Sequence, residues 1–215
     1  TCYICTQALH WKTKEGLVRG CACRGTAGFA HVSCLAEQAK ILVAEAEENN
    51  KALRERFMRW CDCSLCEQTY HGYVQCALGW GCWKTYLDRP ETDPKKTHAM
   101  QFLGNGLCAA NHYLDALSVR EALLSSMRRL GALEEAILCV QGNLAETYRS
   151  LGRDQHALRM LQHVYSGYLR IFGEEQEETL IAANNYAANL VRLERVKEAR
   201  SLLRKTVPVA RRVLG

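Results

Sequence analysis

Proline is scarce in this sequence, with three residues among 215, and two of them lie in the stretch PETDP at 90–94. Proline interrupts helices and central strands, so its scarcity leaves most of the chain free to form long helices. The stretch at 90–94 is the predicted boundary between two parts of the chain. Asp93 before Pro94 also indicates a helix start, because a capping residue there precedes proline in the first turn.

A long apolar run is also missing. The best one, VQCALGWGCW at 74–83, has about half of the roughly 20 residues that a membrane-spanning helix needs. The sequence therefore predicts a soluble chain without a membrane span. Since it begins at Thr1 rather than at methionine, we expect a segment of a longer protein, which leaves a targeting signal upstream open.

A strong excess of charge of one sign is the third absence. The formal net charge is +5, and thiolates bound to a metal would lower it further. So small a charge gives no electrostatic reason to expect nucleic acid as a partner.

Cysteine, by contrast, is abundant: the chain has twelve, and eight of them lie between Cys2 and Cys66. Dense cysteines form disulfides in oxidising compartments or bind metals in reducing ones. CxxC and CxC pairs are too short for comfortable disulfides within each pair, whereas they suit two thiolates on one zinc ion. The sequence thus predicts metal binding in a reducing compartment, the cytoplasm or the nucleus.

The spacing of the candidate ligands is C-x2-C-x15-C-x-C-x7-H-x2-C-x28-C-x2-C. The eight ligands are Cys2, Cys5, Cys21, Cys23, His31, Cys34, Cys63 and Cys66. Eight ligands fill two tetrahedral Zn²⁺ sites and leave no open position for water, so both sites are predicted to be structural. Cys61 would spoil the last CxxC pair if it replaced Cys63, and it is interpreted as a spare thiol.

Residues 1–70 form the first predicted domain, with a long helix inserted at Leu35–Trp60. That segment lacks glycine and proline and is rich in alanine, glutamate, leucine and lysine. The pair Asn49-Asn50 is a candidate interruption of the helix. A helical connector is predicted at 71–94, with its helix at Tyr73–Arg89.

From residue 95 on, the sequence is helical and repetitive. Sliding it by 42 residues superposes, among other pairs, Asn143 on Asn185, Ala145 on Ala187 and Leu161 on Leu203. So many matches at one offset indicate a true repeat. The predicted units cover about 100–140, 141–182 and 183–215, each with two helices around a short turn such as Gly152, and more repeats are expected after residue 215.

The repeat resembles the tetratricopeptide family, in the longer-period variety found in kinesin light chains. The resemblance covers 143–215 and rests on Leu144, Ala145, Tyr148, Gly152, Ala157 and Leu161. It implies an α-solenoid of helical hairpins whose concave face binds a protein or peptide. The recurring arginines are typical of solvated helix ends, with recognition of an acidic partner as the alternative; they are Arg153, Arg170, Arg195 and Arg212.

The N-terminal ligand order, with a CxC pair and seven residues before the histidine, resembles the RING-CH (RING-variant) family of E3 ubiquitin ligases over about the first 70 residues. The resemblance implies a cross-brace, with Cys2, Cys5, His31 and Cys34 on one zinc ion and Cys21, Cys23, Cys63 and Cys66 on the other. The PHD finger shares the ligand order and reads histone tails, but its second pair is normally wider and its histidine closer. The 28 residues between Cys34 and Cys63 exceed the usual gap of the RING-CH family.

The expected fold class is mainly α, with a small two-zinc cross-brace RING-like domain followed by an α-solenoid. By resemblance, the function is that of an E3 ubiquitin ligase, which holds a ubiquitin-charged conjugating enzyme, forms no covalent intermediate and needs no catalytic side chain of its own. Ile4 and Leu65 are the candidate contacts with the conjugating enzyme. Glu67 stands after the last ligand, where active RING domains often carry a cation, so a non-catalytic, zinc-stabilised interaction scaffold is the alternative.

The remaining cysteines and histidines lack paired spacing. The cysteines interpreted as helix-packing residues are Cys76, Cys82, Cys108 and Cys139. The histidines interpreted as surface or packing residues are His10, His71, His98, His112, His156 and His163.

Overall fold

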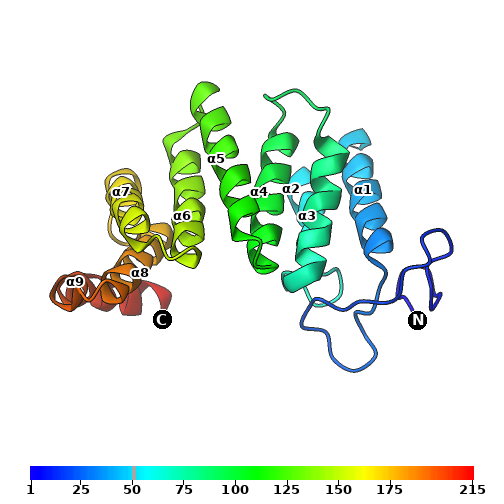
Figure 1. The fold of residues 1–215 in the computed structure, drawn as a ribbon, viewed down its shortest axis with the longest axis horizontal. Coiled ribbons are helices and arrows are strands. Elements are labelled where there is room, and N and C mark those ends of the chain that lie inside the picture. Colours follow the sequence, from blue (N-terminus) through cyan, green and yellow to red (C-terminus); the bar gives the residue numbers. More distant parts are fainter. Residues whose placement is uncertain (50–51) are drawn as a thin grey trace. The chain divides into compact units, whose positions relative to one another are not determined.

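The computed structural model describes residues 1–49 and 52–215, and its regular elements within these ranges are helices (Figure 1). They are α1 (Val32–Glu48), α2 (Leu53–Phe57), the 3-10 helix η1 (Met58–Trp60), α3 (Gly72–Tyr86), α4 (Pro94–Ala109), α5 (Tyr113–Arg129), α6 (Glu134–Ser150), α7 (Asp154–Phe172), α8 (Glu177–Arg192) and α9 (Val196–Leu214). The mainly α prediction is confirmed. None of the described helices has the length and apolar character required to cross a membrane.

The chain divides into two compact units, Thr1–Val119 and Arg120–Gly215. The division falls inside α5 and not at the proline-containing stretch at 90–94. The segment 71–94, predicted as a connector, contributes α3 to the first unit, where this helix pairs with α4.

The long helix predicted at Leu35–Trp60 is interrupted. Helix α1 ends at Glu48, and the Asn49 side-chain amide closes it by donating to the Glu45 carbonyl oxygen at 2.8 Å. Asn50, the second residue of the predicted interruption, lies outside the described residues. A short helix then resumes at Leu53, and η1 delivers the chain to Cys61.

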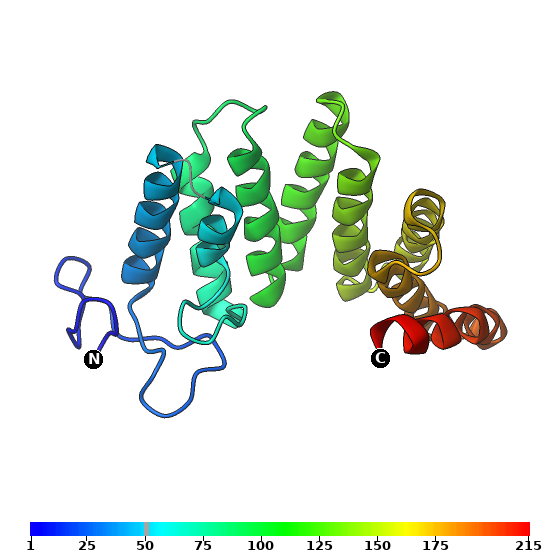
Figure 2. The ribbon, with the colours of Figure 1, turned by 180° about the vertical axis from the view of Figure 1, so that it is seen from behind.

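The interrupted segment packs against the following helical hairpin. Phe57 of α2 is 5% exposed, and its ring lies 5.4 Å from the ring of Tyr86 in α3 and 5.6 Å from that of Phe102 in α4. Trp60 of η1 is 1% exposed and meets Tyr86 edge to face. Figure 2 shows α2 in front of this hairpin. The long gap between Cys34 and Cys63 thus supplies side chains to the core that it shares with α3 and α4.

Helices α3 and α4 approach closely because each presents a glycine to the other. A Cβ atom at Gly79 would lie 2.8 Å from the Phe102 carbonyl oxygen, and one at Gly106 would lie 2.7 Å from the Cys76 Cα. Both obstacles are backbone atoms, which cannot turn aside as a side chain can. The glycines that weaken α3 as an isolated helix are therefore what allows the hairpin to close.

The start of α4 agrees with the prediction from Asp93 and Pro94. The Asp93 carboxylate accepts a hydrogen bond from the Lys95 backbone N–H at 2.9 Å, with Pro94 in the first turn. The Lys95 ammonium also lies 2.6 Å from the Glu47 carboxylate, so the end of α1 and the start of α4 are joined by an ion pair.

The second unit contains the last two predicted repeats as the hairpins α6–α7 and α8–α9, although their predicted starts at 141 and 183 fall inside α6 and α8. Ala145 and Ala157 are fully buried where α6 and α7 touch, as their small size requires. Gly152 turns the first hairpin with a φ of 70°, and Glu194, 42 residues later, adopts a φ of 60° in the second. The repeat therefore preserves the turn even where glycine is replaced.

The recurring arginines mostly form ion pairs within this unit. Arg170 pairs with Glu134 and Arg212 pairs with Glu175, so each of these equivalent arginines pairs with a glutamate at or just before the start of its hairpin. Arg195 pairs with Glu198 at 2.6 Å. These guanidinium groups are engaged by the chain's own carboxylates, which weakens the alternative that they bind an acidic partner.

We predict that Gly106→Ala lowers the free energy of unfolding by about 1–3 kcal/mol, because the added methyl group meets the backbone of α3. Urea unfolding followed by circular dichroism measures the change. The control is Gly142→Ala in α6, where the nearest atom is a Val164 methyl at 4.0 Å and alanine favours the helix. A variant at 106 as stable as the one at 142 would contradict the close packing of α3 on α4.

Candidate metal centres

Two turns of the same kind present the CxxC pairs. In the first, the Cys2 N–H donates to the Gln7 carbonyl and the Thr6 N–H donates to the Cys2 carbonyl, both at 2.9 Å. In the second, the Cys63 N–H donates to the Gln68 carbonyl and the Glu67 N–H donates to the Cys63 carbonyl, both at 3.0 Å. Each turn also points a backbone N–H at its first sulfur, from Ile4 to Cys2 at 3.4 Å and from Leu65 to Cys63 at 3.5 Å.

The residue after each pair closes the turn in the left-handed region, with a φ of 63° at Thr6 and 57° at Glu67. This conformation is strained for side chains with a Cβ atom. Its occurrence after both CxxC pairs indicates that the fold holds these turns in place.

The segment 24–30 between Cys23 and His31, called the strap below, turns tightly against the thiols. The Arg19 guanidinium donates to the Gly25 carbonyl at 2.8 Å, and paired backbone hydrogen bonds of 2.8 and 3.0 Å join Val18 to Ala30. Gly28 has a φ of 78°, and a Cβ atom there would lie 2.6 Å from the Cys23 Cβ and 3.1 Å from the Cys21 sulfur. Only glycine fits at this position.

His31 stands just before α1 and is completely buried. Its Nδ1 atom lies 3.4 Å from the Cys5 sulfur and 3.6 Å from the Cys34 sulfur, while Nε2 lies 3.3 Å from the Ala8 carbonyl oxygen. A proton on Nε2, donated to Ala8, leaves the Nδ1 lone pair directed at the thiols. A carbonyl on the second nitrogen is the usual way in which a metal-binding imidazole is oriented.

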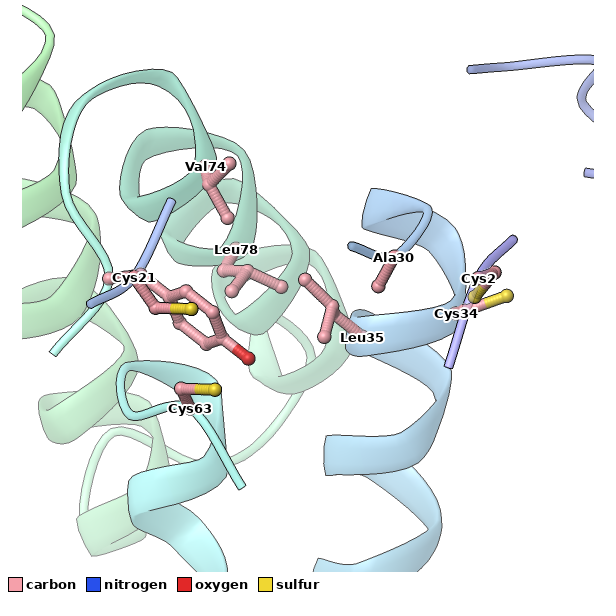
Figure 3. Close-up of a cluster of buried hydrophobic side chains, with 9 residues drawn as sticks. Cys2, Cys21, Ala30, Cys34, Leu35, Cys63, Val74 and Leu78 are labelled. Carbon is pink, nitrogen blue, oxygen red and sulfur yellow. The ribbon is translucent and has the colours of Figure 1, made fainter. Parts of the chain in front are cut away.

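The structure gathers the eight predicted residues into two groups of four, and within each group all candidate ligand atoms lie within 4.8 Å of one another. One group is Cys2, Cys5, His31 and Cys34, and the other is Cys21, Cys23, Cys63 and Cys66. These are the same groups that the cross-brace pairing predicted. Figure 3 shows Cys2 beside Cys34 and Cys21 facing Cys63, with Leu35 and Leu78 between the two groups.

The donor distances fit a tetrahedral zinc ion. Bond lengths of about 2.3 Å to sulfur and about 2.0 Å to nitrogen place two sulfurs about 3.8 Å apart and a sulfur about 3.5 Å from a nitrogen. The sulfurs of Cys23 and Cys63 lie 3.8 Å apart, and the distances from His31 to Cys5 and Cys34 are 3.4 and 3.6 Å. Soft thiolates with one imidazole are also the donor set that zinc favours over magnesium or calcium.

The thiols of the two groups differ in acidity, because backbone hydrogen bonds and burial act on them differently. The pKa of Cys66 is lowered to about 7, chiefly because the Gln68 backbone N–H donates to its sulfur. Burial raises the pKa of Cys34 to about 12, with the neighbouring Cys5 and Cys2 thiols adding to the effect. Like charges at such short range disfavour one another, so a nearby cation is what would keep every thiolate of a group ionised together.

The two CxxC turns meet through the residues between their cysteines. The Tyr3 hydroxyl lies 3.2 Å from the Ser64 hydroxyl, within hydrogen-bonding distance. Leu65 is 52% exposed, as expected of a residue available to a partner. Ile4 is half-buried against the core beneath and is thus less exposed than the sequence suggested.

A third turn of this kind carries no cysteine. The His10 N–H donates to the Glu15 carbonyl, and the Lys14 N–H, at a φ of 59°, donates to the His10 carbonyl. The His10 ring packs against His31 at 5.4 Å and accepts a hydrogen bond from the Thr13 N–H at 3.1 Å. His10 therefore has a packing role beside the first group, and no spacing in the sequence singled it out.

The remaining thiols lie outside both groups. Cys61, Cys76 and Cys82 are buried, which agrees with packing roles. Cys139 is exposed, and the prediction that it packs between helices is wrong, because it lies on the open side of α6.

Together, the fold and the two donor groups define a helical-repeat chain with a cysteine-rich N-terminal unit. Residues 136–212 match the family model described as tetratricopeptide repeat. This segment consists of tetratricopeptide repeats, which confirms that part of the sequence interpretation. No curated protein matches the chain.

The chain is also similar in fold to several solved structures. The kinesin light chain-type, nearly identical TPR-like repeats of Podosopora anserina are 17% identical with a TM-score of 0.54, over 84% of this chain and 76% of that chain. BtubC (BKLC) from P. vanneervenii is 16% identical with a TM-score of 0.59, over 85% of this chain and 75% of that chain. The apo form of RapI is 10% identical with a TM-score of 0.55, over 84% of this chain and 56% of that chain. At such identities the likeness concerns the fold alone.

We predict that Gly28→Ala destabilises the first unit more than Gly25→Ala does. Both glycines have positive φ, so each substitution carries a backbone cost of about 1–2 kcal/mol. Only the methyl group at 28 collides with Cys23, which adds about 1–3 kcal/mol, whereas the space at 25 is open. Thermal unfolding of the two variants compares them directly, and equal losses would contradict the tight strap.

Proposed function

We propose that the two groups each bind one structural zinc ion and that the N-terminal unit is a cross-brace module. The observation that carries the proposal is the interleaving of the pairs, in which the first and third pairs form one group and the second and fourth pairs form the other. Bound zinc would supply a closed, non-catalytic cross-link in place of a large apolar core. Backbone groups around the sites orient these ligands: the Ala8 carbonyl oxygen lies beside His31 Nε2, and the N–H groups of Ile4 and Leu65 point at the sulfurs of Cys2 and Cys63.

We further propose that this module recruits a ubiquitin-charged conjugating enzyme, as a RING-CH-type E3 ubiquitin ligase, and that the repeats hold the substrate or an adaptor. The adjoining CxxC turns support this proposal, since Tyr3 and Ser64 bring them together and each carries an apolar residue between its cysteines. Leu65 offers an exposed contact and Ile4 a half-buried one. Protein binding by the repeats is the part of the function that follows from their tetratricopeptide character.

A second candidate is a non-catalytic scaffold, and Glu67 favours it. Glu67 follows the last cysteine of the second group and carries a negative charge where a cation would aid transfer. Its left-handed φ of 57° closes the turn, so the position has a structural role with any side chain. In this alternative the zinc module stabilises the first unit and presents Leu65 to a different protein.

The zinc proposal predicts two zinc ions per chain by elemental analysis of protein purified without chelator. Removing two ligands of one ion should leave the other ion in place, so Cys5→Ser with His31→Ser is expected to retain one zinc. Cys5→Ser with Cys23→Ser removes a ligand from each ion and is expected to lose both. Cys61→Ser, at a buried thiol outside both groups, is the control and should retain two.

The opposite result for the two double variants would favour pairing in sequence order and contradict the cross-brace. A wild-type chain with one zinc ion or none would contradict the whole metal proposal.

The ligase proposal predicts that the chain accelerates discharge of ubiquitin from at least one of a panel of charged conjugating enzymes. Leu65→Ala and Ile4→Ala should slow discharge by about 5–30-fold, the usual effect of truncating a central interface side chain. Leu87→Ala is the matched control, because Leu87 is 43% exposed but follows α3, outside both CxxC turns.

No acceleration by the zinc-loaded chain with any enzyme of the panel would refute the ligase proposal and favour the scaffold. Equal activity of the Leu65→Ala and Leu87→Ala variants would refute the assigned contact surface. Zinc content measured on the same samples shows whether a loss of activity reflects a loss of the module.

A further inference from the structure

A groove of about 290 Å³ runs along the second unit between α6 and α8, with α7 as its floor. On α8 it is lined by a stripe spaced i, i+3, i+4 and i+7, which consists of Glu178, Ile181, Ala182 and Asn185. This spacing places four side chains on one face of the helix. Ile181 is 51% exposed on this face, so the groove offers an apolar surface to solvent.

Helix α6 presents a matching stripe to the same groove. Its residues are Cys139, Gly142, Asn143 and Glu146, again spaced i, i+3, i+4 and i+7. Asn143 and Asn185 are equivalent in the 42-residue repeat, and both are half-buried. Among the described residues, neither side-chain amide has a hydrogen-bond partner, so both remain available to a ligand.

The charge of the groove is the reverse of the charge of the chain. The whole chain has a formal net charge of +5, yet the groove lining includes two carboxylates, Glu146 and Glu178, and no lysine, arginine or histidine. The Glu146 carboxylate forms an ion pair with the Arg149 guanidinium at 3.3 Å. Glu178 forms no ion pair with any residue in 1–49 or 52–215.

The floor of the groove contributes a neutral polar group, the Tyr168 phenol of α7, which is close enough to Glu178 to be affected by its charge. Burial raises the pKa of Tyr168 to about 12, and the charges of Cys139, Glu178 and Glu135 raise it as well. The phenol therefore remains protonated at neutral pH and can donate a hydrogen bond. Because the phenol is neutral, it leaves the negative charge of Glu146 and Glu178 at the rim unchanged.

From these features we infer that the groove between α6 and α8 binds an extended, basic segment of a partner protein, anchored by an apolar side chain and carrying lysine or arginine toward Glu178. The apolar part of the lining takes the anchor, and charge complementarity selects the basic residue. This inference deepens the protein-binding role proposed for the repeats. It does not depend on zinc binding or on ubiquitin transfer.

The basic partner inferred here differs from the acidic partner that the recurring arginines suggested. Arg170, Arg195 and Arg212 are held by the chain's own carboxylates, and none of them lines the groove. The groove carboxylates offer no counterpart to an acidic peptide and would repel it. The structure thus changes the expected sign of the partner's charge.

Two fluorescein-labelled probes test the inference by anisotropy with the full chain. One is a ten-residue peptide of alternating leucine and lysine with glycine-serine ends, and the other has glutamate in place of lysine. We expect the lysine peptide to bind on the order of tenfold more tightly at about 50 mM salt, with the advantage shrinking at about 300 mM.

A matched pair of variants tests whether the lysine peptide binds in the groove. Glu178→Lys should weaken the lysine peptide at least about fivefold, whereas Glu177→Lys should change its affinity less than about twofold. Both glutamates are exposed in the first turn of α8, so both variants lose the same favourable charge at a helix start and gain the same net charge. Only Glu178 lines the groove.

Equal affinity for the two peptides, tighter binding of the glutamate peptide, or no binding of either would overturn the inference. Equal weakening by the two variants would also overturn it, because it would mark a non-specific effect of net charge. A chain that binds the lysine peptide as expected but fails in ubiquitin discharge leaves this inference intact and refutes only the ligase proposal.

Discussion

The convergence of eight sulfur and nitrogen donors into two groups, each within 4.8 Å, is the constraint on which the first unit depends. Residues 1–31 contain no helix, and their few backbone hydrogen bonds lie mostly in the CxxC turns and around the strap. Burial raises the pKa of Cys34, and the neighbouring Cys5 and Cys2 thiols raise it further, so ionising this thiol without a nearby cation is costly. If the proposed zinc ions cross-link these groups, they would stabilise the helix-free segment 1–31, which directly precedes α1.

The long insertion between Cys34 and Cys63 joins the cysteine-rich segment to helices α3 and α4, because its side chains pack against both helices. Phe57 and Trp60 reach across to Tyr86 and Phe102, so that the segment between Cys34 and Cys63 shares a core with α3 and α4. The glycines of α3 and α4 bring these helices close enough to complete the core. A partner bound at the exposed Leu65 would thus contact a module that is fused to a helical hairpin, which suits either a ligase or a scaffold.

Particular elements show how far sequence reasoning reaches. The 42-residue repeat, the cap at Asp93 and the alanines at the hairpin contact were all predicted, because each depends on neighbours close in sequence or on a regular period. The domain boundary at 90–94 was predicted from composition, whereas the compact units divide inside α5. The helix at Leu35–Trp60 was predicted with Asn49-Asn50 as a candidate interruption, and α1 ends at Glu48 with Asn49 as its cap. Packing of α2 onto α3 and α4 has no local signature, since it depends on side chains up to 45 residues apart.

The candidate sites divide in the same way. Spacing identified the eight donor residues, but neither the imidazole nitrogen that faces the thiols nor the role of His10 beside it could be inferred from spacing. Likewise, the recurring arginines were visible in the sequence, whereas their carboxylate partners became visible only in three dimensions.

The sequence by itself therefore determined the helical class, the repeat and the residue types of the two donor groups, because periodicity and ligand spacing are local properties of the chain. Only the tertiary structure decided which donors meet, which segment fills the core of the first unit and which charge lines the groove of the second. Those outcomes depend on distances between residues remote in sequence, and such distances are set by the packing of whole helices.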